Sequence, residues 1–394
     1  MSSAAKATRS TVAMSARRLR HGMAALLAST ALAGLPASVS RAQDATWAPN
    51  PASTNFENAA NWVGGSVPTG TATFGATSAT FFQVNDPRTM AGWTFTIDSP
   101  GYGINLWSSL TFTGAGISNA GGSVGLSAFA LVTFRNSSAT AGTNINNIGG
   151  LEFLDNSQAG GSINNFSALN FRDSSSAGAA NIANYATIDF QGSSSAGTGS
   201  ITNAGSGRSA SFRDSTTAGS AQIFNSSGGT TTFGNGSTAG NATINNSSGS
   251  KTTFGDDSTA GSATITNFGG GSTTFNGSSS AATAMITSLL SSALIFNDSS
   301  SAGAASVIND SSSSVSFNQS SSAGSAAITN YATGSITFSD TTTAGSATIA
   351  NEGSLQFDGA STAGSATITN NSGSYTLFNH ASTAGGATIF INVG

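Results

Sequence analysis

The sequence predicts an all-β protein built as a parallel β-solenoid, and three patterns in its 394 residues support that fold class. A Phe recurs thirteen times at steps of 18 to 22 residues, and six successive steps are 21 residues long. From the third repeat onward, an Ile or Val follows each Phe by 11 residues. Apolar and polar residues alternate around both positions, which is the period-two pattern of a β-strand.

Composition raises the alternative of disorder, because the chain is poor in large apolar residues. It contains 49 Gly, 6 Pro and no Cys, and its formal net charge is only -4. Disordered chains usually combine low hydrophobicity with high net charge, whereas here apolar residues recur on a fixed period. The periodicity therefore favours a folded repeat protein. The absence of Cys excludes a disulfide framework and any thiolate nucleophile or ligand.

Residues 1–42 have the features of a secretory signal peptide. Lys6, Arg9, Arg17, Arg18 and Arg20 precede an apolar run at 23–35, and small residues before Gln43 suit cleavage after Ala42. The run is too short to span a bilayer as a helix. Met14 is an alternative start that leaves a signal of ordinary length. In both cases we expect the protein to be exported.

The next segment, 43–125, contains all four Trp and most of the irregular sequence. We expect it to be an N-terminal β cap region. Residues 126–394 form the repeat region, with about thirteen coils of a period near 21 residues. A unit this small cannot bury its own apolar face, so its coils must stack on one another.

Each repeat is expected to hold two or three short strands separated by Ala-Gly and Asn-x-Gly or Ser-Gly turns. Two columns of residues should form the core. The Phe column is Phe134, Phe153, Phe171, Phe190, Phe212, Phe233, Phe254, Phe275, Phe296, Phe317, Phe338, Phe357 and Phe378, and the Ile column is Ile182, Ile201, Ile223, Ile244, Ile265, Ile286, Val307, Ile328, Ile349, Ile368 and Ile389.

A column of Asn lies two residues beyond the Ile column. We expect these side chains to form a hydrogen-bond ladder at a turn, because the bend leaves backbone groups to be satisfied. The column comprises Asn184, Asn203, Asn225, Asn246, Asn267, Asn309, Asn330, Asn351 and Asn370.

A column of acids stands two residues after Phe, which raises the alternative of a calcium site. Most of these acids are two coils apart, roughly 9.6 Å at the spacing of β-strands, which is too far to share one ion. We interpret the column as a solvated turn position, with His380 as a surface residue in the same column. Its acids are Asp155, Asp173, Asp214, Asp256, Asp298 and Asp340.

Charge argues against nucleic acid as a partner. Beyond residue 42 the chain has six basic and sixteen acidic residues, a formal net charge of -10. The basic residues are scattered, whereas nucleic-acid binding relies on clustered Lys and Arg. No pattern of residues indicates a catalytic, cofactor-binding or metal site. The basic residues are Arg88, Arg135, Arg172, Arg208, Arg213 and Lys251.

The order of motifs resembles the passenger regions of bacterial autotransporters that carry autotransporter-associated β-strand repeats. TNFENAANWVGGSVPTGTATFG (54–75) is similar to the pattern that opens such passengers, and SSLTFTGAGISNAGG (108–122) to the segment before their repeats. Repeats of the form AGSATITN then follow. The resemblance implies a right-handed β-helix displayed at or beyond the outer membrane of a Gram-negative bacterium.

The chain departs from that family at its C-terminal end. Autotransporters close with a membrane barrel whose strands alternate apolar and polar residues, and no such segment follows Phe378. The chain ends within a coil, since the next Phe would fall near position 399. We therefore expect that the barrel or further coils are missing from this chain, or that another chain continues the helix.

Three function classes follow from these observations. The favoured hypothesis is a non-enzymatic exported protein acting in adhesion, in self-association or as a stalk, with glycans, a host or neighbouring cell surface, or its own copies as partners. The alternative is a polysaccharide-acting β-helix enzyme, but acids are sparse and no long insertion builds a cleft. Ice binding is a third class, and the Thr-x-Thr rows it needs are irregular here.

Overall fold

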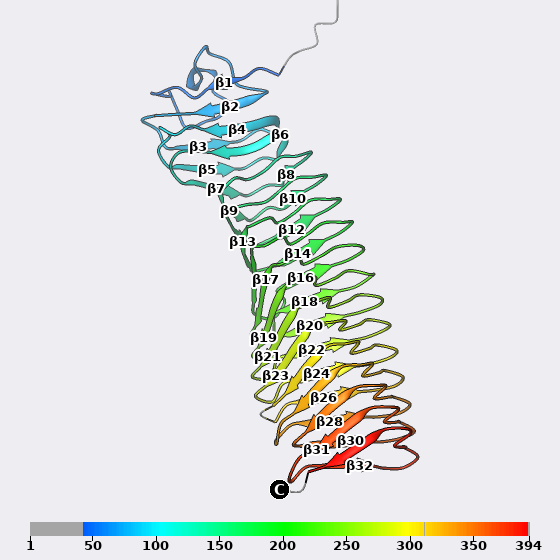
Figure 1. Cartoon of the computed structure of the whole chain (residues 1–394). Coiled ribbons are helices and arrows are strands. Elements are labelled where there is room, and N and C mark those ends of the chain that lie inside the picture. Colours follow the sequence, from blue (N-terminus) through cyan, green and yellow to red (C-terminus); the bar gives the residue numbers. More distant parts are fainter. Residues whose placement is uncertain (1–41, 311, 393–394) are drawn as a thin grey trace, which may run out of the picture. The chain divides into compact units, whose positions relative to one another are not determined.

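The computed structural model describes residues 42–310 and 312–392, whose regular structure is almost entirely β-strand (Figure 1). These residues belong to one compact unit. The helical structure that they contain is the short 3-10 turn η1 (Ala59–Asn61), where the side chain of Asn58 accepts a hydrogen bond from the backbone N–H of Ala60. The predicted signal peptide lies outside the described residues, apart from Ala42.

Two parallel sheets run along the molecule. The first, which we call the Phe sheet, has seventeen strands that pair in the order given. They are β1 (Ala45–Thr46), β2 (Thr71–Phe74), β4 (Arg88–Phe95), β6 (Leu110–Asn119), β8 (Val132–Phe134), β10 (Leu151–Phe153), β12 (Ala168–Phe171), β14 (Thr187–Phe190), β16 (Ser209–Phe212), β18 (Thr230–Phe233), β20 (Lys251–Phe254), β22 (Ser272–Phe275), β24 (Ala293–Phe296), β26 (Ser314–Phe317), β28 (Ser335–Phe338), β30 (Ser354–Phe357) and β32 (Tyr375–Phe378).

The second, which we call the Ile sheet, has sixteen strands that also pair in chain order. They are β3 (Phe81–Val84), β5 (Tyr102–Leu106), β7 (Val124–Ala128), β9 (Asn144–Asn147), β11 (Ser162–Asn165), β13 (Asn181–Asn184), β15 (Ser200–Ala204), β17 (Gln222–Ser226), β19 (Thr243–Ser247), β21 (Thr264–Phe268), β23 (Met285–Leu289), β25 (Ser306–Asn309), β27 (Ala327–Asn330), β29 (Thr348–Asn351), β31 (Thr367–Asn370) and β33 (Thr388–Ile391).

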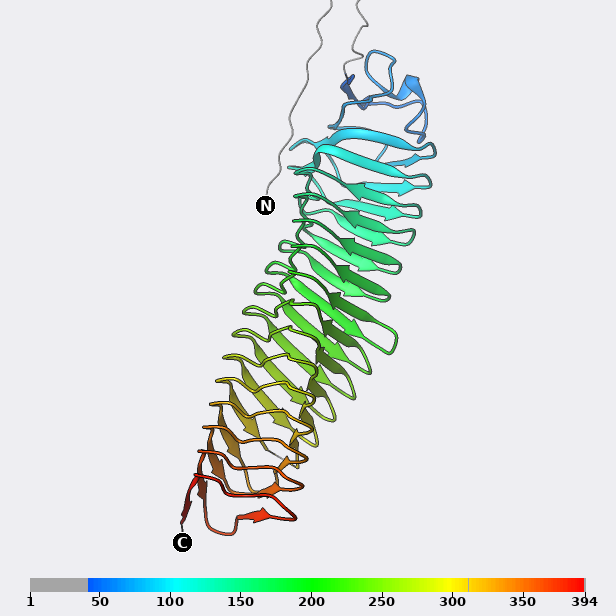
Figure 2. The same ribbon diagram turned by 90° about the vertical axis from the view of Figure 1, so that its right-hand side faces the viewer.

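Each turn of the chain contributes one strand to each sheet and then closes along a third side, where single residues bridge from coil to coil (Figure 2). This arrangement confirms the predicted parallel β-solenoid with a period near 21 residues. The stack has about fifteen turns, more than the thirteen that the Phe column counts, because β2 to β7 already belong to the same two sheets.

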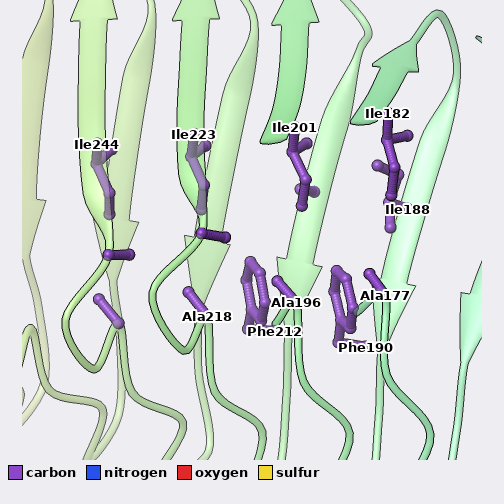
Figure 3. Packing of buried hydrophobic residues seen from close by; sticks show 14 of the residues in the cluster. Ala177, Ile182, Ile188, Phe190, Ala196, Ile201, Phe212, Ala218, Ile223 and Ile244 are labelled. Atoms are coloured by element: carbon purple, nitrogen blue, oxygen red, sulfur yellow. The ribbon is translucent and has the colours of Figure 1, made fainter. Parts of the chain in front are cut away.

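The core is built from columns of identical residues. From Phe112 to Phe378, successive rings of the Phe column stack with centroids 4.5 to 5.0 Å apart. Figure 3 shows Phe190 and Phe212 beside Ala177 and Ala196, with the Ile column above them. The small Ala side chains leave room for the large rings, so that one narrow coil holds both.

The N-terminal coils interrupt this regularity. Between β4 and β6 the pairing register shifts at Met90 and Gly92, so Phe112 pairs with Met90 instead of Phe95. A Cβ at Gly92 would lie 2.7 Å from the carbonyl oxygen of Gly116, so glycine is required for this close approach. Phe112 extends the Phe column by one step of 22 residues, and the register shift explains why the column does not continue upstream of Phe112.

An aromatic cluster covers the first coil. Trp47 and Trp62 pack edge to face with ring centroids 5.0 Å apart, and Trp47 also contacts Phe74 and Phe82. These four side chains are buried. The cluster shields the first aromatic residues of both sheets from solvent.

Candidate functional surfaces

The recurring phrase STAGSATITN at 258–267 accounts for a large part of one coil. The hydroxyl of buried Ser258 donates to the carbonyl oxygen of Phe233 in the preceding coil, at 3.2 Å. Thr259 forms the bridges of the third side, and its Oγ1 accepts a hydrogen bond from the N–H of Gly261 at 3.1 Å. This hydrogen bond between a side chain and the nearby backbone stabilises the tight turn at the corner.

The glycine of the phrase is dictated by backbone geometry. Gly261 has φ +61°, and a Cβ on it would lie 2.8 Å from the carbonyl oxygen of Gly240 one coil earlier. Glycine meets both conditions with the least strain, although Ala282 takes the equivalent position one coil later with φ 51°. The rest of the phrase alternates: Ala263 and Ile265 are buried, while Thr264 and Thr266 face outward.

The Asn column forms the predicted ladder, and the ladder is buried. The Nδ2 of Asn184 donates to Oδ1 of Asn203 at 2.7 Å, and Asn203 donates in turn to Asn225 at 2.9 Å. A second Nδ2 proton reaches a backbone carbonyl, as from Asn184 to Ser209 at 3.0 Å. The ladder begins earlier than predicted, at Asn147 and Asn165. Because the amide groups of the ladder are bonded to one another and to the backbone, they are not available to a ligand.

One rung of the ladder is missing. Ser288 replaces Asn, and its Oγ accepts a long bond of 3.3 Å from Asn267. In the next coil, Oδ1 of Asn309 is buried without a hydrogen-bond partner. The coil of Ser288 then turns through Leu290 and Ser291. Both have positive φ (53° and 59°), a conformation that costs energy in residues other than glycine.

The acidic column occupies turns, and the structure gives it a role that the sequence interpretation missed. All six Asp have positive φ between 51° and 59°, which Asp tolerates better than most residues. Each carboxylate accepts a hydrogen bond from the backbone N–H at the same position one coil earlier, for example Asp298 from Gly277 and Asp340 from Gln319, both at 2.8 Å. The side chains therefore tie neighbouring corners together.

His380 lies in the same turn column, as predicted. It has φ 56°, is 77% exposed in its side chain, and has Nδ1 3.6 Å from Oδ1 of Asp358. Among the residues that the structure describes, no three or more His, Cys, Asp or Glu side chains converge on a possible metal position.

The outward residues of the Ile sheet form rows of mixed hydroxyl, amide and small side chains. Hydrogen bonds link some neighbours along these rows, such as Ser162 to Asn144 at 2.6 Å and Asn164 to Asn146 at 2.9 Å. Beside the Thr264 and Thr266 pair, the adjacent strand places Met285 opposite Thr264. The rows are polar but irregular, which agrees poorly with a lattice-matching surface such as that expected for ice binding.

Two groups in the N-terminal coils have altered proton affinity. Burial raises the pKa of Tyr102 to about 12, with a smaller contribution from the charge of Asp98, while a hydrogen bond with Thr77 opposes the shift. The phenol donates to the carbonyl oxygen of Gly75 at 3.2 Å. The hydrogen bond from Thr96 lowers the pKa of the exposed Asp98.

A cavity of about 350 Å³ lies in the last described coil. Its lining belongs to β31, β32, β33 and the turn before β32, and includes the core residues Phe378 and Ile389. The side chains there are apolar, hydroxyl or amide, with Tyr375 the one titratable group in the lining. The cavity lies at the exposed edge of the core, where Tyr375 and Ile391 are 51% and 72% exposed, and it presents no arrangement of acid, base and nucleophile.

Comparison of the chain with protein-family models, curated proteins and solved structures gave no match. Within the described part of the chain, no helix has the length and apolar character needed to cross a membrane.

Proposed function

We propose that this protein is an exported, non-enzymatic rod that acts as a spacer and contact surface at or outside the cell, in the manner of an autotransporter passenger. The observation that carries the proposal is the unbroken pairing of both sheets from β2 to β33. The apolar columns bind each coil to its neighbours, and from β9 to β31 the amide ladder adds to them in all coils except that of Ser288. What the coils present to solvent is mainly a set of parallel rows of Ser, Thr, Asn and Ala.

Such rows suit weak contacts that repeat along the rod. A single hydroxyl or amide contributes little binding energy, but many linked contacts give avidity when the partner also repeats. Glycans, a host or neighbouring cell surface, and further copies of the chain all have this character. Export is supported by the basic and apolar segments within residues 1–42.

Glycan binding is tested on arrays printed at high and low density, with the released products analysed by mass spectrometry. We expect retention that rises steeply with glycan density and no shortened oligosaccharides. Catalytic release of oligosaccharides would replace the proposal with the alternative, a polysaccharide-acting enzyme. If the protein is retained on none of the arrays and on no cell surface, the proposed contact role is wrong and only the spacer role remains.

Export is tested by expressing the full chain in a Gram-negative host and sequencing the N-terminus of the protein recovered from each compartment. The proposal predicts an N-terminus at Gln43 outside the inner membrane. Recovery of the uncleaved chain from the cytoplasm alone would contradict it.

A further inference from the structure

One corner of the solenoid carries large apolar side chains that neither the core nor the ladders use. Five successive coils place such a residue directly after their Ile-sheet strand, and we call this set the aromatic ridge: Trp107, Phe129, Ile148, Phe166 and Tyr185. The backbone N–H of each of the last four donates to a carbonyl one coil earlier, at 2.8 to 3.0 Å. The five residues therefore lie one above another along the corner.

The ridge is exposed, although each of its rings has at least one face covered by a neighbour. Exposure ranges from 37% for Phe129 to 53% for Phe166. Trp107 stacks on Phe129 at 4.1 Å and Phe166 stacks on Tyr185 at 4.8 Å, both nearly parallel. The guanidinium of Arg208 covers Tyr185 at 4.8 Å. Stacking of a sugar or base needs a free ring face, and in these two pairs the facing ring surfaces are taken by the partner ring.

The ridge lies in a part of the corner that carries no negative charge. The turns that carry it, at 107–109, 129–131, 148–150, 166–167, 185–186 and 205–208, contain no acidic residue and one basic residue, Arg208. The described part of the chain has a formal net charge of -10. Further along the same corner, Asp310 and Glu352 occupy the ridge position. The apolar stretch thus lies within the part of this corner, from 107 to 292, whose turns carry no acidic residue.

We propose that the aromatic ridge is a docking surface for the interfacial region of a lipid bilayer. A convex corner has a small contact area with a flat, rigid partner. A fluid lipid interface can deform around the corner and so contact more of it. Trp, Tyr and Phe favour the level of the lipid headgroups, and Arg208 is placed to meet phosphate there. Five half-exposed side chains offer on the order of 400 Å² of apolar surface, the size of patch that is often functional.

The chain contains its own reporter for this contact. Trp107 is 50% exposed, whereas Trp47, Trp62 and Trp93 are at most 3% exposed. Adding phosphatidylcholine vesicles containing phosphatidylglycerol to the full chain should shift the tryptophan emission to the blue. Vesicles with brominated acyl chains should quench the same emission. Residues 1–41 contain no Trp, so a blue shift cannot come from a Trp within them.

A matched pair of variants tests whether the ridge itself is responsible. Tyr185 and Tyr331 occupy the same corner position and are 45% and 39% exposed, but Tyr331 lies between the coils of Asp310 and Glu352. Tyr185→Ser should weaken vesicle binding on the order of fivefold to tenfold through lost apolar contact. Tyr331→Ser should change it less than twofold.

Three results would overturn the proposal. The first is an emission spectrum that neither shifts nor is quenched with vesicles, a measurement on the unmodified chain that depends on no variant folding. The second is an equal loss of binding in Tyr185→Ser and Tyr331→Ser. The third is a blue shift that grows with protein concentration in the absence of lipid, which would assign the ridge to contact between copies of the chain.

Discussion

The amide of Asn225 shows how little freedom a repeated residue has in this fold. It accepts a hydrogen bond from Asn203 and donates one to Asn246, both at 2.9 Å, and it is almost completely buried. Loss of the side chain would leave two neighbouring polar groups without partners, and each such group costs about 1 to 3 kcal/mol. Residues of this kind are fixed by their neighbours in adjacent coils.

Tyr102 gives a pH dependence at the same scale. Its pKa is about 12 in the folded state, above the ordinary tyrosine value of 10.0, so the unfolded chain loses the proton first as pH rises. The stabilisation is complete below pH 10 and is lost between pH 10 and about 12. Tyr102→Phe should flatten this part of the stability profile, as measured by urea unfolding at about pH 8 and about pH 11. Equal losses in both proteins would contradict the assignment to Tyr102.

The backbone conformation of Ser291 predicts that a substitution there will change the stability of the protein. It has φ 59°, and glycine fills the corresponding turn position in other coils, as at Gly228, Gly249 and Gly270. Ser291→Gly should raise the free energy of unfolding by about 1 kcal/mol, because the left-handed conformation no longer carries a Cβ. Chemical denaturation measures the change. Ser299→Gly, in a turn where φ is not positive, serves as the control and should lower stability; a gain there would contradict the explanation.

At the scale of elements, the strands are held together by ladders that cross from coil to coil. The ladder between β21 and β25 is interrupted because Ser288 in β23 is too short to reach Asn309. Asn is accommodated at the equivalent place in neighbouring coils, beside a similar apolar residue, as Asn330 is beside Ile336. The interruption is therefore a matter of one side chain.

Ser288→Asn should restore the ladder. We expect a gain of about 1 to 2 kcal/mol, since a buried acceptor gains its donor and a long hydrogen bond shortens. The gain is measured by chemical denaturation, with Ser306→Asn on the outer face of β25 as a control that should stay within about 0.5 kcal/mol. If Ser288→Asn were destabilising, the ladder would not be the feature that limits this coil.

At the scale of the whole molecule, each coil contacts mainly its two neighbours. Stability should then be a sum of coil and interface contributions instead of one property of a single core. A defect in a central coil is expected to separate the coils on either side of it. This separation is expected for a defect in any central coil, because both sheets run through all of the coils.

Phe254→Ala tests this expectation. Removing a fully buried ring should cost about 3 to 5 kcal/mol. Hydrogen exchange should show the largest loss of protection in the coils next to β20, and thermal unfolding should become less cooperative. Phe268→Ala, which removes a 48% exposed ring nearby, should have a small effect on both measurements. A uniform loss of protection from β2 to β33 would show that the stack unfolds as one unit.

Much of this architecture was predictable because every coil of a solenoid needs the same kind of residue at the same position. The Phe, Ile and Asn columns each lie at one place in the coil, so their spacing directly indicates strands and stacking. The carboxylate contacts of the Asp column were not predictable, because they depend on which backbone N–H lies below a turn. Nor were the first coils, where the shift between Met90 and Gly92 breaks the period.

The sequence by itself determined the fold class, the period and the identity of the core columns, since alternation and spacing are properties of the chain alone. Only the tertiary structure decided which residues from different coils share a surface. Trp107 and Phe129 are 22 residues apart, and it is the register between β5 and β7 that stacks them at 4.1 Å. An outward residue meets its neighbours through coil pairing, and that pairing creates the aromatic ridge.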